Sequence, residues 1–383
     1  MSLTPAMLSQ IRALSANAIE ATGELATAIC RVPAPTGHEA ERAAFVAALI
    51  RERGYQAEID EIGNVYARRG NRGGRAMMAL AHTDTVFPEG TDLKVVRIDN
   101  ELHGPAIGDN SLGVAARISA LQILDKLEVE TESDIIAVAN VGEEGLGNLR
   151  GARAAVERFH DELGAVVAIE GHNLGRITHV AVGSKRWRVT VRGPGEHSWG
   201  AFGQPSAIHG LGRIIAAIAE LEVPSDPRTT FNVGIIDGGT SINTIASAAS
   251  ALIDMCSVDA SALDALATRV GRIIAASVGD GLTVDVETLG ERPAGSRDKH
   301  DPFVQAASDA LSWLGMDTVY DASSTDANIP IGLNIPSLCI GITHGGRGHT
   351  VEEYIALPPV ELGLAQLVRL CLDATALISS RSS

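Results

Sequence analysis

The chain has 383 residues, of which 45% are hydrophobic and 20% are charged, and its formal net charge is −16. This length exceeds the size at which a single core usually keeps growing, so two domains are expected. A strongly negative surface repels polyanions, which excludes nucleic acid and anionic membranes as expected partners.

The N-terminus lacks a basic start followed by an apolar core, so no signal peptide is predicted. No apolar run reaches the ~20 residues that a bilayer span requires. The cysteines Cys30, Cys256, Cys339 and Cys371 have no paired spacing. This scatter is typical of free thiols in a reducing compartment. We therefore expect a cytoplasmic protein.

The first part of the chain predicts an α/β layer structure. Short apolar runs at 77–81, 134–141 and 165–169 are bounded by glycine and polar residues, which is typical of buried parallel strands. Strands that alternate with helices favour an α/β fold with a mainly parallel sheet. The remaining elements expected here are helices over 4–53, broken by the prolines in 32–37, a strand pair at 56–60 and 65–68, and a helix over 111–127.

The pattern changes near residue 176. Residues alternate in polarity over 178–191, as expected of a half-exposed antiparallel strand. The order of elements that follows is ferredoxin-like, so we predict an inserted α+β domain over 177–295, with 1–176 and 296–383 forming the larger domain. The expected elements are helices at 206–221, 263–278 and 301–314, strands at 231–236, 248–257, 282–288 and 337–342, and a return linker at 290–295.

Each of the three apolar runs leads into a metal-type ligand: His82, the pair Glu143–Glu144, and Glu170. Sites in open α/β sheets form outside the carboxyl ends of the strands. One imidazole and several carboxylates are therefore expected at one edge of one sheet. Asp84 shares the strand face of His82 and can accept the other ring N–H.

Several of these residues have plainer interpretations when taken singly. Asp109 precedes a helix and is also a good N-cap. Paired glutamates such as Glu143–Glu144 are often solvated, but here they end a buried run, and adjacent carboxylates stay ionised only beside a cation. His344 and His349 follow the last strand and add two imidazoles. Histidine with carboxylates and no cysteine suits zinc, cobalt or manganese, and five ligands suit two ions that share one carboxylate.

The order of these motifs resembles the dinuclear zinc metallopeptidase family of carboxypeptidase G, peptidase T, acetylornithine deacetylase, succinyl-diaminopimelate desuccinylase and aminoacylase. The resemblance covers nearly the whole chain. It implies that His82 and Glu170 hold one ion, that Glu144 and His349 hold the other, and that Asp109 bridges them. Asp84 would orient His82, and Glu143 would be the general base. His349 is preferred to His344 because family members follow the ligand with a small residue and then Glu, as in 349–352.

The resemblance also implies that the inserted domain is a lid and a homodimerisation domain. His197 matches a histidine that stabilises the oxyanion, and Asn243 matches a substrate-contacting asparagine. Without the resemblance, His197 is an ordinary loop residue and Asn243 a turn residue. The other substrate-binding candidates are Arg292, His344, Asp326 and Asn328, although 324–328 also reads as a polar loop or cap.

Two positions depart from the family. The usual Asp-x-Arg reads Asp254-Met255-Cys256, and the usual Asp-Asp-Lys reads Asp109-Asn110-Ser111. Neither change removes a proposed ligand. We expect a two-metal exopeptidase acting on short peptides, with an N-acyl-amino-acid deacylase as the alternative and a non-catalytic, metal-stabilised protein as the less favoured one.

Overall fold

The computed structural model describes residues 3–279 and 281–382, which form two compact units. The large unit comprises the described residues up to Ala181 and those from Ser296 onward, and the small unit spans Val182–Gly295. The first boundary lies later than the predicted 176–177. The reason is that strand β8 (Arg176–Ala181) pairs within the sheet of the large unit instead of opening the inserted one.

The large unit is built on a nine-stranded sheet whose main path is β1-β2-β6-β3-β7-β17-β8-β15, with β16 paired to β8. The four central strands β6, β3, β7 and β17 are parallel, as the apolar runs predict. The bounds are β1 (Glu58–Ile59), β2 (Val65–Arg69), β3 (Ala76–His82), β6 (Asp134–Asn140), β7 (Leu163–Glu170), β15 (Gly295–Ser296), β16 (Val319–Ser323) and β17 (Ser337–Gly341).

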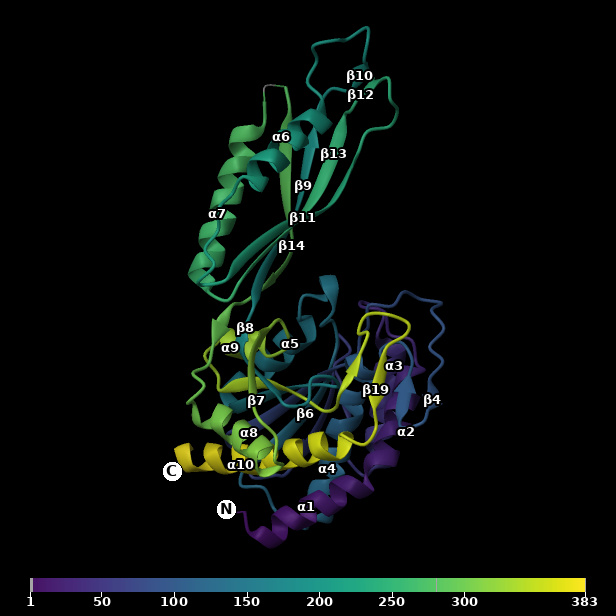
Figure 1. Ribbon diagram of the computed structural model, residues 1–383, viewed down its shortest axis with the longest axis vertical. Coiled ribbons are helices and arrows are strands. Elements are labelled where there is room, and N and C mark those ends of the chain that lie inside the picture. The colour runs from purple at the N-terminus through teal and green to yellow at the C-terminus, as the bar shows by residue number, and fades with distance from the viewer. Residues whose placement is uncertain (1–2, 280, 383) are drawn as a thin grey trace. The chain divides into compact units, whose positions relative to one another are not determined.

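Helices bury both faces of this sheet (Figure 1). Met77 and Ala79 of β3 belong to one apolar cluster, whereas Met78 and Leu80 belong to another, because successive strand residues point to opposite faces. One cluster contains residues of α1 (Pro5–Asn17), α2 (Ile19–Cys30), α3 (Ala40–Glu52), α4 (Gly113–Lys126), α8 (Pro302–Trp313) and α10 (Val360–Ser382), and the other contains residues of α5 (Arg150–Arg158) and α9 (Asn328–Gly332).

Helix α10 is the one helix in the described residues that is long and apolar enough to span a bilayer, by length and composition alone. This helix was not predicted from the sequence. Its most apolar window is 67% buried within the protein. The helix packs against α1, α8 and the parallel strands (Figure 1), so its apolar character is that of a core helix.

A second, four-stranded sheet of the large unit has the order β18-β19-β5-β4 and was not predicted from the sequence. Its strands are β4 (Val96–Ile98), β5 (Glu101–His103), β18 (Gly345–Gly346) and β19 (Tyr354–Ala356). Strand β19 pairs with β5, with Tyr354 opposite His103. This pairing brings the segment around His349 back to the loop that carries Asp109. Short helical turns are η1 (Ile107–Leu112), η2 (Gly145–Gly147) and η3 (His160–Glu162).

The small unit has the predicted ferredoxin-like β-α-β-β-α-β order, with an antiparallel sheet ordered β11-β13-β9-β14. Residues from both helices pack with this sheet in a single apolar cluster. Strand β14 continues to Arg292, so most of the predicted linker 290–295 is strand. The bounds are β9 (Gly183–Arg192), β10 (Glu196–His197), α6 (Ala207–Ala219), β11 (Thr229–Gly238), β12 (Thr244–Ile245), β13 (Ala248–Ser257), α7 (Ala260–Ser277) and β14 (Thr283–Arg292).

Candidate metal centre

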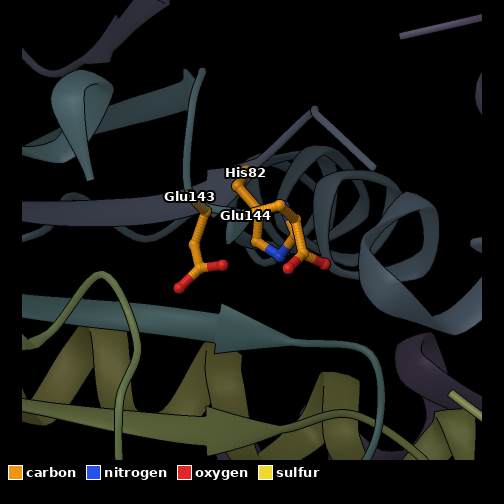
Figure 2. A group of neighbouring side chains, drawn as sticks. All are labelled: His82, Glu143 and Glu144. Atoms are coloured by element: carbon orange, nitrogen blue, oxygen red, sulfur yellow. The ribbon is translucent and has the colours of Figure 1, made fainter. Parts of the chain in front are cut away.

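The carboxyl ends of three neighbouring parallel strands converge at one edge of the large sheet. His82 ends β3, Glu170 ends β7, and Glu143 and Glu144 follow β6 directly. In the register of β3 and β6, His82 lies opposite Asn140, so the two strand ends are level. Figure 2 shows His82, Glu143 and Glu144, each of which offers a ligand atom within 4.8 Å of the others.

Two further groups of metal-type ligands share Asp109. One contains His82, Asp109 and Glu170, and the other contains Asp109, Glu144 and His349. His82 Nε2 lies 3.1 Å from Asp109 Oδ1 and 3.7 Å from Glu170 Oε2. His349 Nε2 lies 3.0 Å from Asp109 Oδ2 and 3.2 Å from Glu144 Oε1. The two oxygens of Asp109 therefore face two different imidazoles.

Asp84 connects the strand ends to one another. Its Oδ1 accepts a hydrogen bond from the backbone N–H of Glu143 and its Oδ2 accepts one from that of Glu144, each at 2.9 Å. His82 Nδ1 lies 3.2 Å from the Asp84 carbonyl oxygen and 3.6 Å from its carboxylate. Asp84 is fully buried, so this one carboxylate holds the Glu143–Glu144 turn beside the imidazole of His82.

The loop that carries Asp109 is held by Glu353, which the sequence analysis missed. This carboxylate is fully buried and accepts hydrogen bonds from the backbone N–H groups of Ala106, Gly108 and Asp109, at 3.0, 2.8 and 2.7 Å. Glu352, the glutamate that ends the family-like stretch 349–352, is exposed. Glu353 is the next residue after Glu352 and directly precedes the short strand β19, and this position was the sequence signal for it. The pairing of β19 with β5 turns Glu353 toward the loop that carries Asp109.

His172 is a second residue that the sequence analysis missed. Its Nε2 lies 2.8 Å from Glu353 Oε1. Burial lowers the pKa of His172, but Glu353 outweighs that effect and the net shift is upward. A histidine two residues after Glu170, in a loop, offered no periodic signal in the sequence. It contributes a hydrogen-bond partner for the buried Glu353 carboxylate.

Asn110, where the family carries Asp, uses both ends of its amide. Its Nδ2 donates to the carbonyl of Ile169 at 2.7 Å, and its Oδ1 accepts from the N–H of Gly171 at 3.0 Å. A carboxylate could not donate to Ile169. Asn110 thus ties the Asp109 loop to the end of β7, on both sides of Glu170. The Asp109–Asn110 peptide bond is cis.

The crowded carboxylates and imidazoles shift one another's pKa values. Burial lowers the pKa of His82, but Glu170, Asp109 and Asp84 outweigh it and raise the pKa well above the ordinary value. Hydrogen bonds to Asp109 and Glu144 raise the pKa of His349 to about 10. Burial raises the pKa of Glu170 to about 7. The surrounding carboxylates therefore favour the protonated form of both imidazoles.

Asp326 and Asn328, predicted to contact substrate, are buried inside the large unit. Asp326 Oδ2 accepts a hydrogen bond from Asn140 Nδ2 at 2.7 Å, and Asn328 Oδ1 accepts one from the backbone N–H of Thr325 at 2.9 Å. In these contacts both side chains stabilise the turn that leads into α9. His344 belongs to none of the metal-type groups found among residues 3–279 and 281–382, unlike His349.

The other predicted substrate contacts lie in the small unit. His197 and Asn243 are neighbours there: β10 pairs with β12, and the N–H of Ser198 donates to the carbonyl of Asn243 at 2.9 Å. Arg292 ends β14 and is 6% exposed, so it is a strand residue instead of the linker residue that was predicted.

Asp254, in the stretch 254–256 where the resemblance would place an arginine, is paired with an arginine of the neighbouring strand. Asp254 Oδ1 accepts a hydrogen bond from Arg186 Nε at 3.1 Å, because β9 and β13 place Arg186 directly opposite Asp254. The Cys256 thiol donates to the other carboxylate oxygen. All four cysteines are free thiols.

Comparison with known proteins identifies relatives of this chain. It is 23% identical over 345 residues to the uncharacterized protein YqjE of Bacillus subtilis, covering 85% of this chain and 90% of that protein. Its fold is similar to that of aminopeptidase PepT from Bacillus cereus, with a TM-score of 0.77, 22% identity and coverage of 94% and 99% of the two chains.

The fold is also similar to that of Bacillus subtilis YXEP, described as a dinuclear metal-binding peptidase of family M20, with a TM-score of 0.70, 17% identity and coverage of 94% and 98%. At such identities the structural likeness shows the fold alone. The sequence model of peptidase family M20/M25/M40 matches residues 78–373, which include every ligand candidate. The chain therefore belongs to peptidase family M20/M25/M40, and it is a metallohydrolase that acts on amide bonds.

Proposed function

We propose that this chain is an exopeptidase acting on short peptides, with two divalent metal ions and Glu143 as the general base. The observation that carries the proposal is the pair of ligand groups that share Asp109. His82, Asp109 and Glu170 would hold one ion, and Asp109, Glu144 and His349 the other. Histidine nitrogens and carboxylate oxygens, without cysteine, are donors that suit zinc, with cobalt or manganese as alternatives.

Two ions bound there would activate a water molecule and polarise the scissile carbonyl. The protein groups have separate tasks. Asp84 holds the Glu143–Glu144 turn, and Glu143 belongs to neither group that shares Asp109. In this proposal the Glu143 carboxylate takes a proton from the attacking water and passes it to the leaving amine nitrogen.

We further propose that the small unit forms a homodimer and that its His197 contacts the oxyanion. Trp199 and Phe202, close to His197 in sequence, are 88% and 93% exposed in the single chain, and Ile242 beside Asn243 is fully exposed. Large apolar side chains gathered in this way mark interaction surfaces. We propose that a second copy covers them, that the small unit acts as a lid, and that the enzyme works in the cytoplasm.

The decisive test of the general base is Glu143→Gln. We expect the variant to keep its metal, measured by elemental analysis, and to lose about 10²- to 10⁴-fold in kcat, because the amide cannot accept the proton. Glu52→Gln, at an exposed position on α3, is the matched control and should retain full activity. Normal turnover by the Glu143 variant would overturn the assignment.

The substrate class is tested by amine release from zinc- or cobalt-loaded protein. Unblocked di- and tripeptides are compared with N-acyl amino acids. Cleavage of unblocked peptides supports the exopeptidase. Cleavage of acylated substrates alone would replace it with an N-acyl-amino-acid deacylase.

A further inference from the structure

A cavity of about 450 Å³ lies beside Glu144 in the large unit. Its size is within the range of small-molecule sites. Glu144 lines it and also belongs to the ligand group with Asp109 and His349, so the cavity adjoins the proposed second metal position through this one residue. The apolar part of its lining is Pro35, Val86, Phe87, Pro88 and Leu146.

The apolar lining is open to an incoming group. Val86 is 40% exposed and Leu146 is 61% exposed, whereas Phe87 is 8% exposed and forms a fixed wall. Two exposed large hydrophobic side chains next to a ligand cluster leave apolar surface in water. Covering that surface with an apolar group is favourable.

The polar groups of the lining already have partners. Thr36 Oγ1 donates to Asp84 Oδ2 at 2.9 Å. The backbones of the two walls pair with each other, since the N–H of Thr85 donates to the carbonyl of Ala34 and the N–H of Thr36 donates to that of Thr85. An incoming polar side chain would therefore lose hydration and gain few hydrogen bonds in return.

The one cation of the lining is also neutralised. Arg150 Nη2 lies 2.6 and 2.7 Å from the two carboxylate oxygens of Glu39, which is 4% exposed. Glu39 in turn accepts from the N–H of Gly37 at 3.0 Å. Because this pair carries no net charge, Arg150 is already balanced by Glu39, and the other charged group of the lining, Glu144, belongs to the proposed metal site.

We infer that this cavity is the specificity pocket of the enzyme and that it takes an uncharged apolar side chain, of the size of leucine or phenylalanine, from a residue next to the scissile bond. The inference rests on the proposed function and names its substrate class. Val86 and Leu146 would contact the side chain, and the Glu39–Arg150 pair would disfavour charged ones.

The test compares kcat/KM for two tripeptide series, Xaa-Gly-Gly and Gly-Xaa-Gly, with Leu, Phe, Gly, Asp or Lys at the varied position. If only acylated substrates are cleaved, N-acetyl amino acids with the same side chains replace them. We expect Leu and Phe to exceed Gly, Asp and Lys by about tenfold or more in one series, which is the scale of discrimination that apolar pockets reach.

Two substitutions locate the preference. In Val86→Ser/Leu146→Ser the ratio of Leu to Gly should fall about tenfold. Val319→Ser, at a 54% exposed position on β16, should leave the ratio unchanged. In Glu39→Gln, which keeps an acceptor oxygen but removes the negative charge that balances Arg150, the ratio of Asp to Leu should rise.

The outcomes separate the two proposals. Hydrolysis with equal rates for all side chains, or an apolar preference that survives in Val86→Ser/Leu146→Ser, would overturn this inference and leave the exopeptidase standing. No hydrolysis of any peptide or N-acetyl amino acid by the metal-loaded enzyme would overturn the proposed function and the pocket with it.

Discussion

At the scale of single residues, neighbouring glutamates have different tasks. Glu352 is exposed, whereas Glu353 is buried and accepts three backbone N–H groups of the Asp109 loop. Orphaned buried donors cost roughly 1–3 kcal/mol each. The position of the shared carboxylate therefore depends on a residue that is not itself in a ligand group.

We expect Glu353→Ala to release the Asp109 loop, to weaken binding of at least one metal ion and to lower kcat. The measurement is a zinc titration followed by calorimetry, together with elemental analysis of the purified protein. Glu352→Ala is the adjacent control and should bind two ions as the wild type does. Equal metal content and activity in both variants would refute the anchoring role of Glu353.

A second prediction at this scale concerns pH. The pKa of His349 is raised to about 10 in the metal-free protein, so its imidazole carries a proton at neutral pH. A metal ion binds only the neutral ring, so binding must release that proton. Metal affinity should fall as the pH is lowered, and the release from His349 should vanish as the pH rises through 10.

Calorimetry at pH about 7.5 in buffers of different ionisation enthalpy counts these protons. His349→Ala should release about one proton fewer than the wild type. His160→Ala, at an exposed histidine outside the ligand groups, should release the same number as the wild type. An unchanged count in the His349 variant would contradict the expected proton release.

At the scale of elements, the close approach of α5 to the end of β6 positions Glu143 and Glu144. The N–H of Gly151 donates to the carbonyl of Val141, and Asn64 bridges the same two segments by accepting from Val141 and donating to Gly151. A Cβ on Gly151 would lie 2.3 Å from the Val141 oxygen, closer than any real contact.

Gly151→Ala should therefore push α5 away from β6, lower the Tm and reduce activity. Gly212→Ala is a matched control, because this glycine lies exposed in α6 and an added Cβ meets nothing within 4 Å. The control should leave activity unchanged and raise stability by up to about 1 kcal/mol through helix propensity. Thermal unfolding and peptide hydrolysis measure both effects. A normal Gly151 variant would contradict the packing argument.

At the scale of the whole molecule, the exposed apolar side chains of the small unit predict a homodimer. Sedimentation velocity at micromolar concentration should give the mass of two chains. Trp199→Ser/Phe202→Ser should shift the enzyme toward the monomer. Val319→Ser, which also removes an exposed apolar side chain but lies in the large unit, should not. A wild-type monomer would refute the proposed dimer.

Local sequence patterns were enough to predict the main sheet, the inserted domain and the candidate ligands at the strand ends. Buried parallel strands read as nearly continuous apolar runs, and each run here leads directly into a candidate ligand, so His82, Glu143, Glu144 and Glu170 were visible as local patterns. The ferredoxin-like order was readable for the same reason, since helices and half-exposed strands leave different periodicities.

The residues that join the candidate metal centre from parts of the chain far from these strand ends could be identified only from the fold. Glu353 reaches the Asp109 loop only because the three-residue strand β19 pairs with β5, and such short strands leave almost no period in the sequence. The same pairing turns His349, and not His344, toward Asp109. Contacts between residues far apart in the chain depend on register and loop closure, which local composition does not encode.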